Sequence, residues 1–229
     1  MKKLFLIIFL TAAGTATFAQ TIGGSFLFGY PQGDFRKNVD KMGFGGQIQG
    51  TFWTPSKSRP FTIGFDVGYL VYGQVDERRP WIGFPGVFLN LSRTNSMASG
   101  HILMQITPFF GTIRPYVEGL FGGAYLFTQT SVRNENKNEE IASSNNFDDF
   151  AWNYGGGAGI LLRFSGAAEN VEGIFLDLKA RYLFGTETKY LGEESVTFNT
   201  VGDVIYKPFK SKTDFFSFHI GVIANLDLL

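Results

Sequence analysis

The chain has 229 residues with 20 basic and 20 acidic side chains, so its formal net charge is zero and a nucleic-acid partner gains no support. The absence of cysteine excludes disulfides, thiolate metal sites, a cysteine nucleophile and an acylated N-terminal cysteine. Hydrophobic residues make up 44% of the chain and aromatic residues 17%, yet after residue 19 no apolar run approaches the roughly 18 residues of a membrane-spanning helix.

The first nineteen residues have the features of a secretory signal peptide. Two lysines precede an apolar run, 4–10, and small residues lead to Ala19, after which cleavage would leave Gln20 as the first residue. We expect residues 1–19 to be removed and residues 20–229 to form one domain. Without the two lysines, 18 basic residues remain against 20 acidic ones, so the mature charge is about −2.

Apolar and polar residues then alternate with a period of two, in blocks separated by turn residues, which predicts β-strands. In the block 173–186, for example, one face is wholly apolar and the other holds Asp177, Lys179 and Arg181. The same reading predicts eight strands, at 22–30, 43–53, 61–73, 101–110, 115–127, 150–164, 173–186 and 216–228.

The connections between these blocks alternate in length. Those at 54–60, 111–114 and 165–172 are short, whereas the other four are long. This alternation is typical of an outer-membrane β-barrel whose termini lie on the periplasmic, short-turn side. We therefore predict an all-β fold, a closed antiparallel transmembrane barrel of eight strands; a secreted β-sandwich is the alternative.

Aromatic residues gather at both ends of the predicted strands, as in the two interfacial girdles of such barrels. Toward the long loops these are Tyr30, Tyr69, Tyr72, Tyr125, Phe127, Trp152, Tyr154, Tyr182, Phe184 and Phe216, and toward the turns Phe52, Trp53, Phe61, Phe109, Tyr116 and Phe164.

Three features carry a resemblance to a known family, and the first is the Ala19-Gln20 start of the mature chain. The first strand runs into Gly29-Tyr30-Pro31-Gln32-Gly33-Asp34-Phe35, and Arg114-Pro115-Tyr116-Val117-Glu118-Gly119 opens a later strand. With these strings the mature chain resembles the small outer-membrane β-barrel superfamily, in the form common in Bacteroidetes genomes. That family usually ends in an aromatic residue, whereas this chain ends in Leu229.

The polar faces of the strands predict a charge network inside the barrel. An eight-stranded barrel is only wide enough for its own side chains to fill, and a buried ion costs several kcal/mol unless it is paired. Three acids and three bases, with a histidine nearby, would balance in two stacked layers. We expect Glu118, Arg163 and Asp177 toward the periplasmic end and Asp66, Lys179, Arg181 and His219 nearer mid-height. The predicted network comprises Asp66, Glu118, Arg163, Asp177, Lys179, Arg181 and His219.

Three kinds of chemistry find little support. The glycine run 155–159 lacks the spacing and the following Lys-Ser/Thr of a phosphate loop, and two histidines, His101 and His219, cannot build a zinc site without carboxylates. Ser217 and His219 share a strand face, as in enzymes that act on lipid A, but that face points into the barrel, away from acyl chains. We expect no cofactor, no metal and no catalysis.

Long loops are the places where function is expected, because the strands are committed to lipid and packing. The loop 74–100 carries Arg78, Arg79, Trp81 and Phe84, an apolar and basic combination that predicts a site for a protein or surface ligand; alternatively, residues 87–93 extend the strands and the aromatics pack on them. The acidic loop 131–149 is a weaker candidate for calcium.

The sequence thus predicts a non-enzymatic protein of the Gram-negative outer membrane that presents surface loops for binding, adhesion or envelope structure. Outer-membrane lipid and lipopolysaccharide are its expected partners. A lipid A-modifying enzyme and a small-solute pore are the alternatives.

Overall fold

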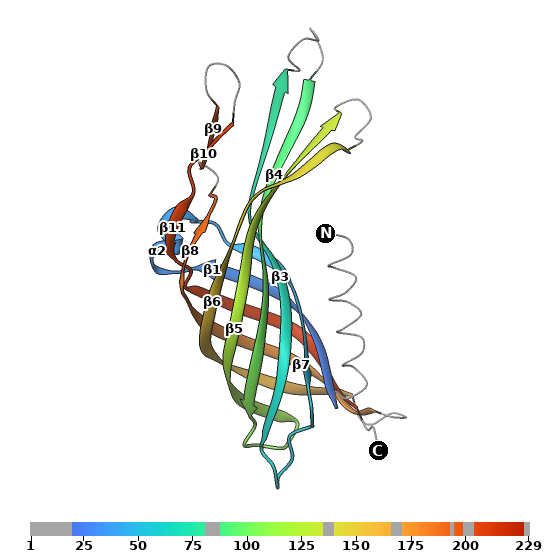
Figure 1. The fold of residues 1–229 in the computed structure, drawn as a ribbon. Coiled ribbons are helices and arrows are strands. Elements are labelled where there is room, and N and C mark those ends of the chain that lie inside the picture. Colours follow the sequence, from blue (N-terminus) through green and yellow to red (C-terminus); the bar gives the residue numbers. More distant parts are fainter. Residues whose placement is uncertain are drawn as a thin grey trace.

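Eight long strands close into one antiparallel barrel in the computed structural model (Figure 1), which describes residues 20–80, 88–134, 140–165, 171–192, 195–198 and 204–226. Around the barrel the order is β1-β12-β7-β6-β5-β4-β3-β2, so each strand pairs with its barrel neighbours in the chain and β1 closes on β12. Their bounds are β1 Thr21–Pro31, β2 Gly43–Thr51, β3 Phe61–Pro80, β4 Phe88–Ile106, β5 Ile113–Asn134, β6 Glu140–Ser165, β7 Val171–Gly185 and β12 Phe215–Leu226. The predicted eight-stranded barrel is confirmed. The predicted signal peptide lies outside the described residues.

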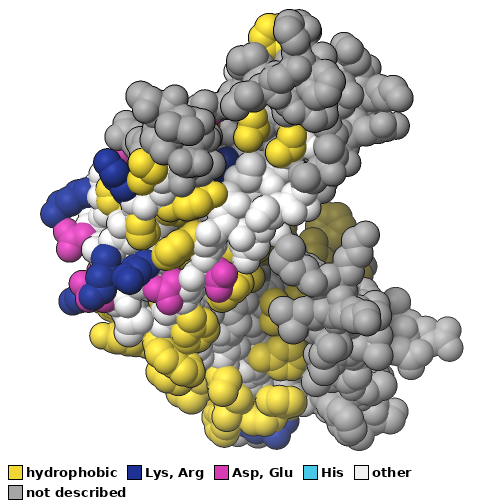
Figure 2. All heavy atoms as spheres, turned by 45° about the horizontal axis from the view of Figure 1, so that its top comes forward, with side chains coloured by type: hydrophobic (Ala, Val, Ile, Leu, Met, Phe, Trp, Pro, Cys, Tyr) yellow, Lys and Arg dark blue, Asp and Glu magenta, His cyan; other side chains and the backbone are white. Residues whose placement is uncertain are grey.

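Every second side chain of a barrel strand points away from the lumen. Many of these outward side chains are large and apolar, so the outer wall of the barrel is apolar. Phe26 is 74% exposed and Phe164 84% exposed, and many large apolar residues of the other strands are also open to the surroundings. Figure 2 shows such side chains gathered over the lower barrel, with charged side chains above them. In water this surface would be an unusually large apolar patch, whereas hydrocarbon would solvate it.

Four strands are much longer than predicted. β3 continues to Pro80 and β4 begins at Phe88, so most of the supposed loop 74–100 is strand. Likewise β5 reaches Asn134 and β6 begins at Glu140. The two hairpins rise above the barrel as one four-stranded sheet, because β4 also pairs with β5 as far as Leu89 and Asn134. The extended parts of these strands have polar residues on both faces, so the alternation of apolar and polar residues that predicts a strand is missing there.

Two predicted girdle residues point inward instead. Tyr72 and Tyr116 are each only 2% exposed, and each belongs to a buried apolar cluster. Both residues occupy positions whose side chains point into the barrel. The alternation along the strand therefore predicts their direction better than their aromatic character does. Among the described residues, no helix is long and apolar enough to cross a bilayer.

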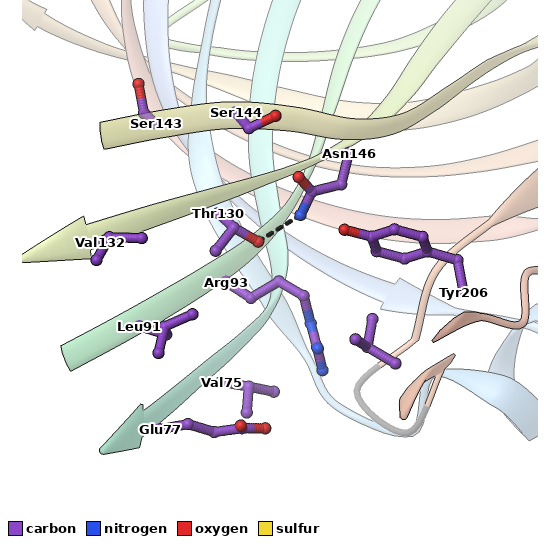
Figure 3. A pocket seen from close by; sticks show the side chains of 11 residues that line it. Val75, Glu77, Leu91, Arg93, Thr130, Val132, Ser143, Ser144, Asn146 and Tyr206 are labelled. Atoms are coloured by element: carbon purple, nitrogen blue, oxygen red, sulfur yellow. Dashed lines mark hydrogen bonds between the residues drawn. The ribbon is translucent and has the colours of Figure 1, made fainter. Parts of the chain in front are cut away.

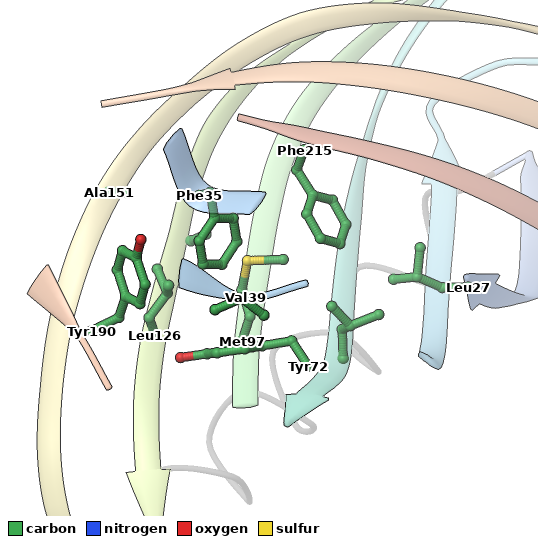
Figure 4. Close-up of a cluster of buried hydrophobic side chains, with 11 residues drawn as sticks. Leu27, Phe35, Val39, Tyr72, Met97, Leu126, Ala151, Tyr190 and Phe215 are labelled. Carbon is green, nitrogen blue, oxygen red and sulfur yellow. The ribbon is translucent and has the colours of Figure 1, made fainter. Parts of the chain in front are cut away.

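The long connection after β1 folds back over the barrel mouth. It contains the short helix α2 (Gly33–Asn38), entered through Gly33, whose φ of +56° favours glycine. Phe35 of this helix lies at the centre of an apolar cluster that closes the mouth (Figure 4). Its ring meets Tyr72 at 5.7 Å and Tyr190 at 4.8 Å between centroids, both edge to face.

The last long connection supplies the other side of this closure. β8 (Glu187–Tyr190) pairs with β11 (Phe209–Lys212), and β9 (Val196–Phe198) pairs with β10 (Val204–Tyr206). Tyr190 of β8 accepts a hydrogen bond from Asn38 at 2.8 Å and lies 2.7 Å from the Ser211 hydroxyl. These bonds connect α2 to the β8–β11 pair beside it, so the first and last long connections form one cap.

Candidate functional site

The interior charges form two groups rather than the two layers expected. In the first group Arg181 donates to both oxygens of Glu118, with Nε 2.5 Å from Oε1 and Nη2 3.1 Å from Oε2, and its Nη1 lies 3.0 Å from Asp66 Oδ2. Asp66 also meets His101 at 2.8 Å, and the other ring nitrogen of His101 lies 3.0 Å from Asn153 Oδ1. All five side chains are buried, so Arg181 joins acids that were assigned to different layers.

The second group surrounds Lys179. Its ammonium lies 3.2 Å from Asp177 Oδ2 and donates to Gln49. Asp177 accepts a further hydrogen bond from the Tyr116 hydroxyl at 2.6 Å. Lys179 and Asp177 therefore face each other as opposite charges, and each also has a neutral hydrogen-bonding partner, which is the condition for tolerating ions inside a barrel.

Arg163 does not belong to either group. It lies near the short-turn end, where its side chain is exposed and its guanidinium lies 5.8 Å from the centre of the Phe175 ring. Arg163 occupies an inward-facing position of β6, as predicted, but this position is at the rim of the barrel and the side chain reaches solvent. His101, Asn153, Gln49 and Tyr116 share the inward parity of the predicted residues and are the partners that a search for charges alone overlooks.

His219 lies apart from the acids. Its Nε2 is 2.9 Å from the Ser217 hydroxyl, and both residues are buried. Within the described part of the chain, Nδ1 has no hydrogen-bond partner, so the pair lacks the third group that would orient a histidine as a general base. The described residues also contain no group of three or more histidine, cysteine or acidic side chains that could hold a metal ion.

The predicted loop site is the tip of the β3–β4 hairpin. Arg78 lies on the outer side of β3, with its guanidinium 4.0 Å from the centre of the Phe88 ring, and Arg79 follows it in the strand. Trp81 and Phe84 lie outside the described residues. The structure therefore does not bring the four predicted residues together in one described site.

A different feature of the long hairpins forms a concave site, which we call the hairpin hollow. It lies between the extended sheet of β3–β6 and the β9–β10 hairpin and has a volume of about 180 Å³ (Figure 3). Its lining comprises Val75, Glu77, Leu91, Arg93, Thr130, Val132, Ser143, Ser144, Asn146, Val196 and Tyr206.

The strand register arranges the sheet side of the hollow in two rows. In the row nearer the barrel, Arg93 stands opposite Val75 and Thr130, and in the next row Leu91 stands opposite Glu77 and Val132. On the facing hairpin Val196 pairs with Tyr206. Arg93 is buried although it is the one basic residue of the lining, and Asn146 donates to Thr130 beside it.

Sequence reasoning missed Arg93, although a signal was present. Arg93 has the same parity along β4 as the inward residues His101 and Asn95, and continuing the alternation past the predicted strand end would have placed it on the inner face. Tyr206 could not be found this way, because the β9–β10 hairpin is separate from the barrel sheet.

Comparison with known proteins gives structural likeness only. No family model matches the chain, and no curated protein matches it. Among solved structures, Neisserial surface protein A is 12% identical, with a TM-score of 0.38 and coverage of 90% of this chain and 96% of that one. Ail, the attachment invasion locus protein of Yersinia pestis, is 9% identical in its complex with the heparin analogue sucrose octasulfate, with a TM-score of 0.40 and coverage of 89% and 96%.

A major outer membrane protein from Thermus thermophilus is 13% identical, with a TM-score of 0.37 and coverage of 89% of this chain and 98% of that one. All three scores are below 0.5, so the functional assignment rests on the geometry of the chain itself.

Proposed function

We propose that the chain is a non-enzymatic integral protein of the Gram-negative outer membrane that presents a binding site on its long hairpins. The observation that carries this proposal is the wall of the closed barrel, where large apolar side chains such as Phe26, Phe121 and Trp152 are exposed. A sheet crosses hydrocarbon only when it is closed, because each unpaired backbone group there costs several kcal/mol. Lipid and lipopolysaccharide would then be its immediate surroundings.

The orientation follows from the unequal ends of the barrel. Outer-membrane barrels have short periplasmic turns and long extracellular connections, so the turns after β2 and β4 would face the periplasm and the hairpin hollow would face outward. The Bacteroidetes-type resemblance remains a prediction. A lipid A-modifying enzyme gains no support, since the Ser217–His219 pair is buried in the barrel. A small-solute pore gains none either, since charged side chains occupy the lumen.

Single cysteines test the location and the orientation together, because the chain has no cysteine of its own. Ser143→Cys lies at the hollow and Ser58→Cys lies in the turn between β2 and β3, and both positions are exposed. On intact cells a membrane-impermeant maleimide should label Ser143→Cys alone, and it should label Ser58→Cys only after the outer membrane is opened. Labelling of both on intact cells, or recovery of the protein in the soluble periplasmic fraction, would contradict the proposal.

A further inference from the structure

The hairpin hollow has two apolar sides that face each other. Leu91 and Val132 line it from the sheet, and Val196 and Tyr206 line it from the β9–β10 hairpin. Figure 3 shows the Tyr206 ring across the space from Leu91 and Val132. A ligand placed between the two sides would be removed from water on both of its faces, which is favourable for an apolar molecule.

The two charged residues of the lining already interact within the chain. Glu77 and Arg93 each have such an interaction, and Arg93 is only 7% exposed. A charged ligand would therefore have to compete with contacts that the protein makes by itself, or enter the hollow without a counter-charge. Because taking an unpaired charge out of water is costly, the lining favours a ligand that has no charge.

The other polar groups of the lining are neutral. Ser144 stands opposite Thr130 in the strand register and is exposed, whereas Thr130 accepts the hydrogen bond from Asn146. A hydroxyl group can both donate and accept a hydrogen bond, so a hydroxyl group of a ligand can bond to Ser144 while the rest of the ligand lies between the apolar sides. The lining therefore suits an apolar body with one neutral polar group.

The size of the hollow limits the ligand to about one ring. Its volume is about 180 Å³, and an apolar cavity of about 150 Å³ is large enough to hold a benzene molecule. Pockets for drug-sized ligands begin at roughly 300 Å³. A ring also suits the Tyr206 side chain, because two aromatic rings attract each other beyond the effect of the area that they bury.

We propose that the hairpin hollow binds a small uncharged aromatic molecule, such as a phenol or an aromatic alcohol, with its ring between the sheet and Tyr206 and its hydroxyl group toward Ser144. This inference rests on the proposed function insofar as the hollow must open to the outside of the cell. The ligand class itself depends only on the residues of the lining.

A series of three small molecules tests the ligand class on the unaltered, full-length barrel in a lipid nanodisc. Benzyl alcohol, benzoate and benzylamine carry a neutral, an acidic and a basic group next to the same ring, so the ring cannot enter without bringing that group to the hollow. Methyl NMR titrations that follow Leu91 should give benzyl alcohol saturable binding that is roughly tenfold tighter than that of either ion, because an ion loses water there without gaining a counter-charge. Equal or tighter binding of either ion, or no saturable shift with benzyl alcohol, would overturn the proposal.

Two substitutions on β5 test the sheet side of the site. Val132→Phe puts a ring of the protein into the hollow and should weaken benzyl alcohol binding by roughly tenfold or more, because a well-filled space does not accept further atoms without strain. Ser131→Phe is the matched control and should change the binding by less than about twofold, because neighbouring residues of a strand point to opposite faces of the sheet. Unchanged binding in Val132→Phe, or an equal loss in both variants, would contradict a seat for the ring in the hollow.

Two substitutions of one residue test the hairpin side. Tyr206→Phe keeps the ring and should leave benzyl alcohol binding within about twofold, whereas Tyr206→Ala removes the ring and should weaken the binding by roughly tenfold. Equal binding in both variants and in the unaltered protein would show that the ligand does not lie against Tyr206 and would contradict the proposed site.

A shift in gel mobility on heating reports whether each variant still folds as a barrel, and if a variant does not, the ligand series on the unaltered protein decides alone. Failure of that series together with external labelling of Ser143→Cys refutes the ligand class and leaves the outer-membrane assignment standing. Success of the series without external labelling refutes the assignment instead.

Discussion

Arg181 and Glu118 meet across a glycine. In the strand register Gly157 of β6 stands opposite Arg181 of β7 on one side and opposite Glu118 of β5 on the other. The two side chains cross this gap and form a two-pronged ion pair, with N···O distances of 2.5 and 3.1 Å. Because Gly157 has no side chain, the Arg181 and Glu118 side chains have room to contact each other over it.

Removing the guanidinium should destabilise the barrel strongly. Arg181→Ala leaves the Glu118 and Asp66 carboxylates buried without their cation, and breaking a buried ion pair in this way typically costs about 3–5 kcal/mol. Lys210→Ala is the control, since its pair with Glu187 at 2.9 Å is exposed and such pairs contribute about 0–1 kcal/mol. Urea unfolding of the refolded barrel measures both; similar free energies of unfolding for the two variants would indicate a lumen wet enough to solvate the charges.

The glycine itself provides a second test. A Cβ atom at position 157 would lie 2.6 Å from the Ala180 carbonyl oxygen, 2.8 Å from Arg181 Cγ and 3.2 Å from Glu118 Oε1. We expect Gly157→Ala to cost about 1–3 kcal/mol of unfolding free energy, as overpacking usually does. Gly119→Ala is the matched control because a Cβ there meets nothing within 4 Å; equal effects would mean that the pair adjusts around the methyl group.

The cap over the barrel mouth should depend on one ring. Phe35 is 1% exposed, and truncating a buried phenylalanine typically costs about 3–5 kcal/mol. Phe35→Ala should therefore free α2 and increase protease cleavage within residues 32–42 while the barrel still shifts in gel mobility on heating. Arg36→Ala changes the next, exposed residue and should leave cleavage unchanged. Equal protection of both variants would show that the hydrogen bonds to Tyr190 hold the cap without the ring.

Outside the barrel strands, one carboxyl group has a shifted pKa that can be measured. The hydrogen bond from Lys37 Nζ, at 2.7 Å, lowers the pKa of Asp34 below its ordinary value of 3.8. Any stability this pair contributes is present above the ordinary pKa and is lost as the pH falls through the lowered one. Carboxyl carbon NMR should show the Asp34 pKa rising toward 3.8 in Lys37→Met; an unchanged pKa would show that the pair is not formed in solution.

The lumen should not conduct as a general pore. Lys179, Arg181 and their partners fill its middle, and the Phe35 cluster covers one end. Planar-bilayer recordings of the folded protein should show no large, stable, ohmic steps. Such steps in the unaltered protein would refute a filled interior.

Much of the barrel could be predicted because alternation is enforced on both faces within hydrocarbon: Ile220 must meet lipid while its neighbour His219 must meet the lumen. Above the rim this constraint ends, so residues such as Gln74 and Ser131 continue their strands without an apolar signal. The pairing of Arg181 with Asp66 depends on the stagger of strands that are distant in the barrel order. That stagger is a property of barrel closure, which no single strand encodes.

The seam between β1 and β12 joins the two ends of the chain, with Thr21 opposite Asn225 and Pro31 opposite Phe215. Every other barrel pair joins successive barrel strands, and of these only β7 and β12 are separated by further strands, β8 to β11. Most pairs can therefore form from local hairpins, whereas the seam must bring together residues about two hundred positions apart. The segment that is synthesised last therefore completes the edge that was made first. Until β12 pairs with it, β1 is an open edge, which water can solvate but hydrocarbon cannot. In the proposed outer-membrane setting we therefore expect the barrel to close no later than it inserts.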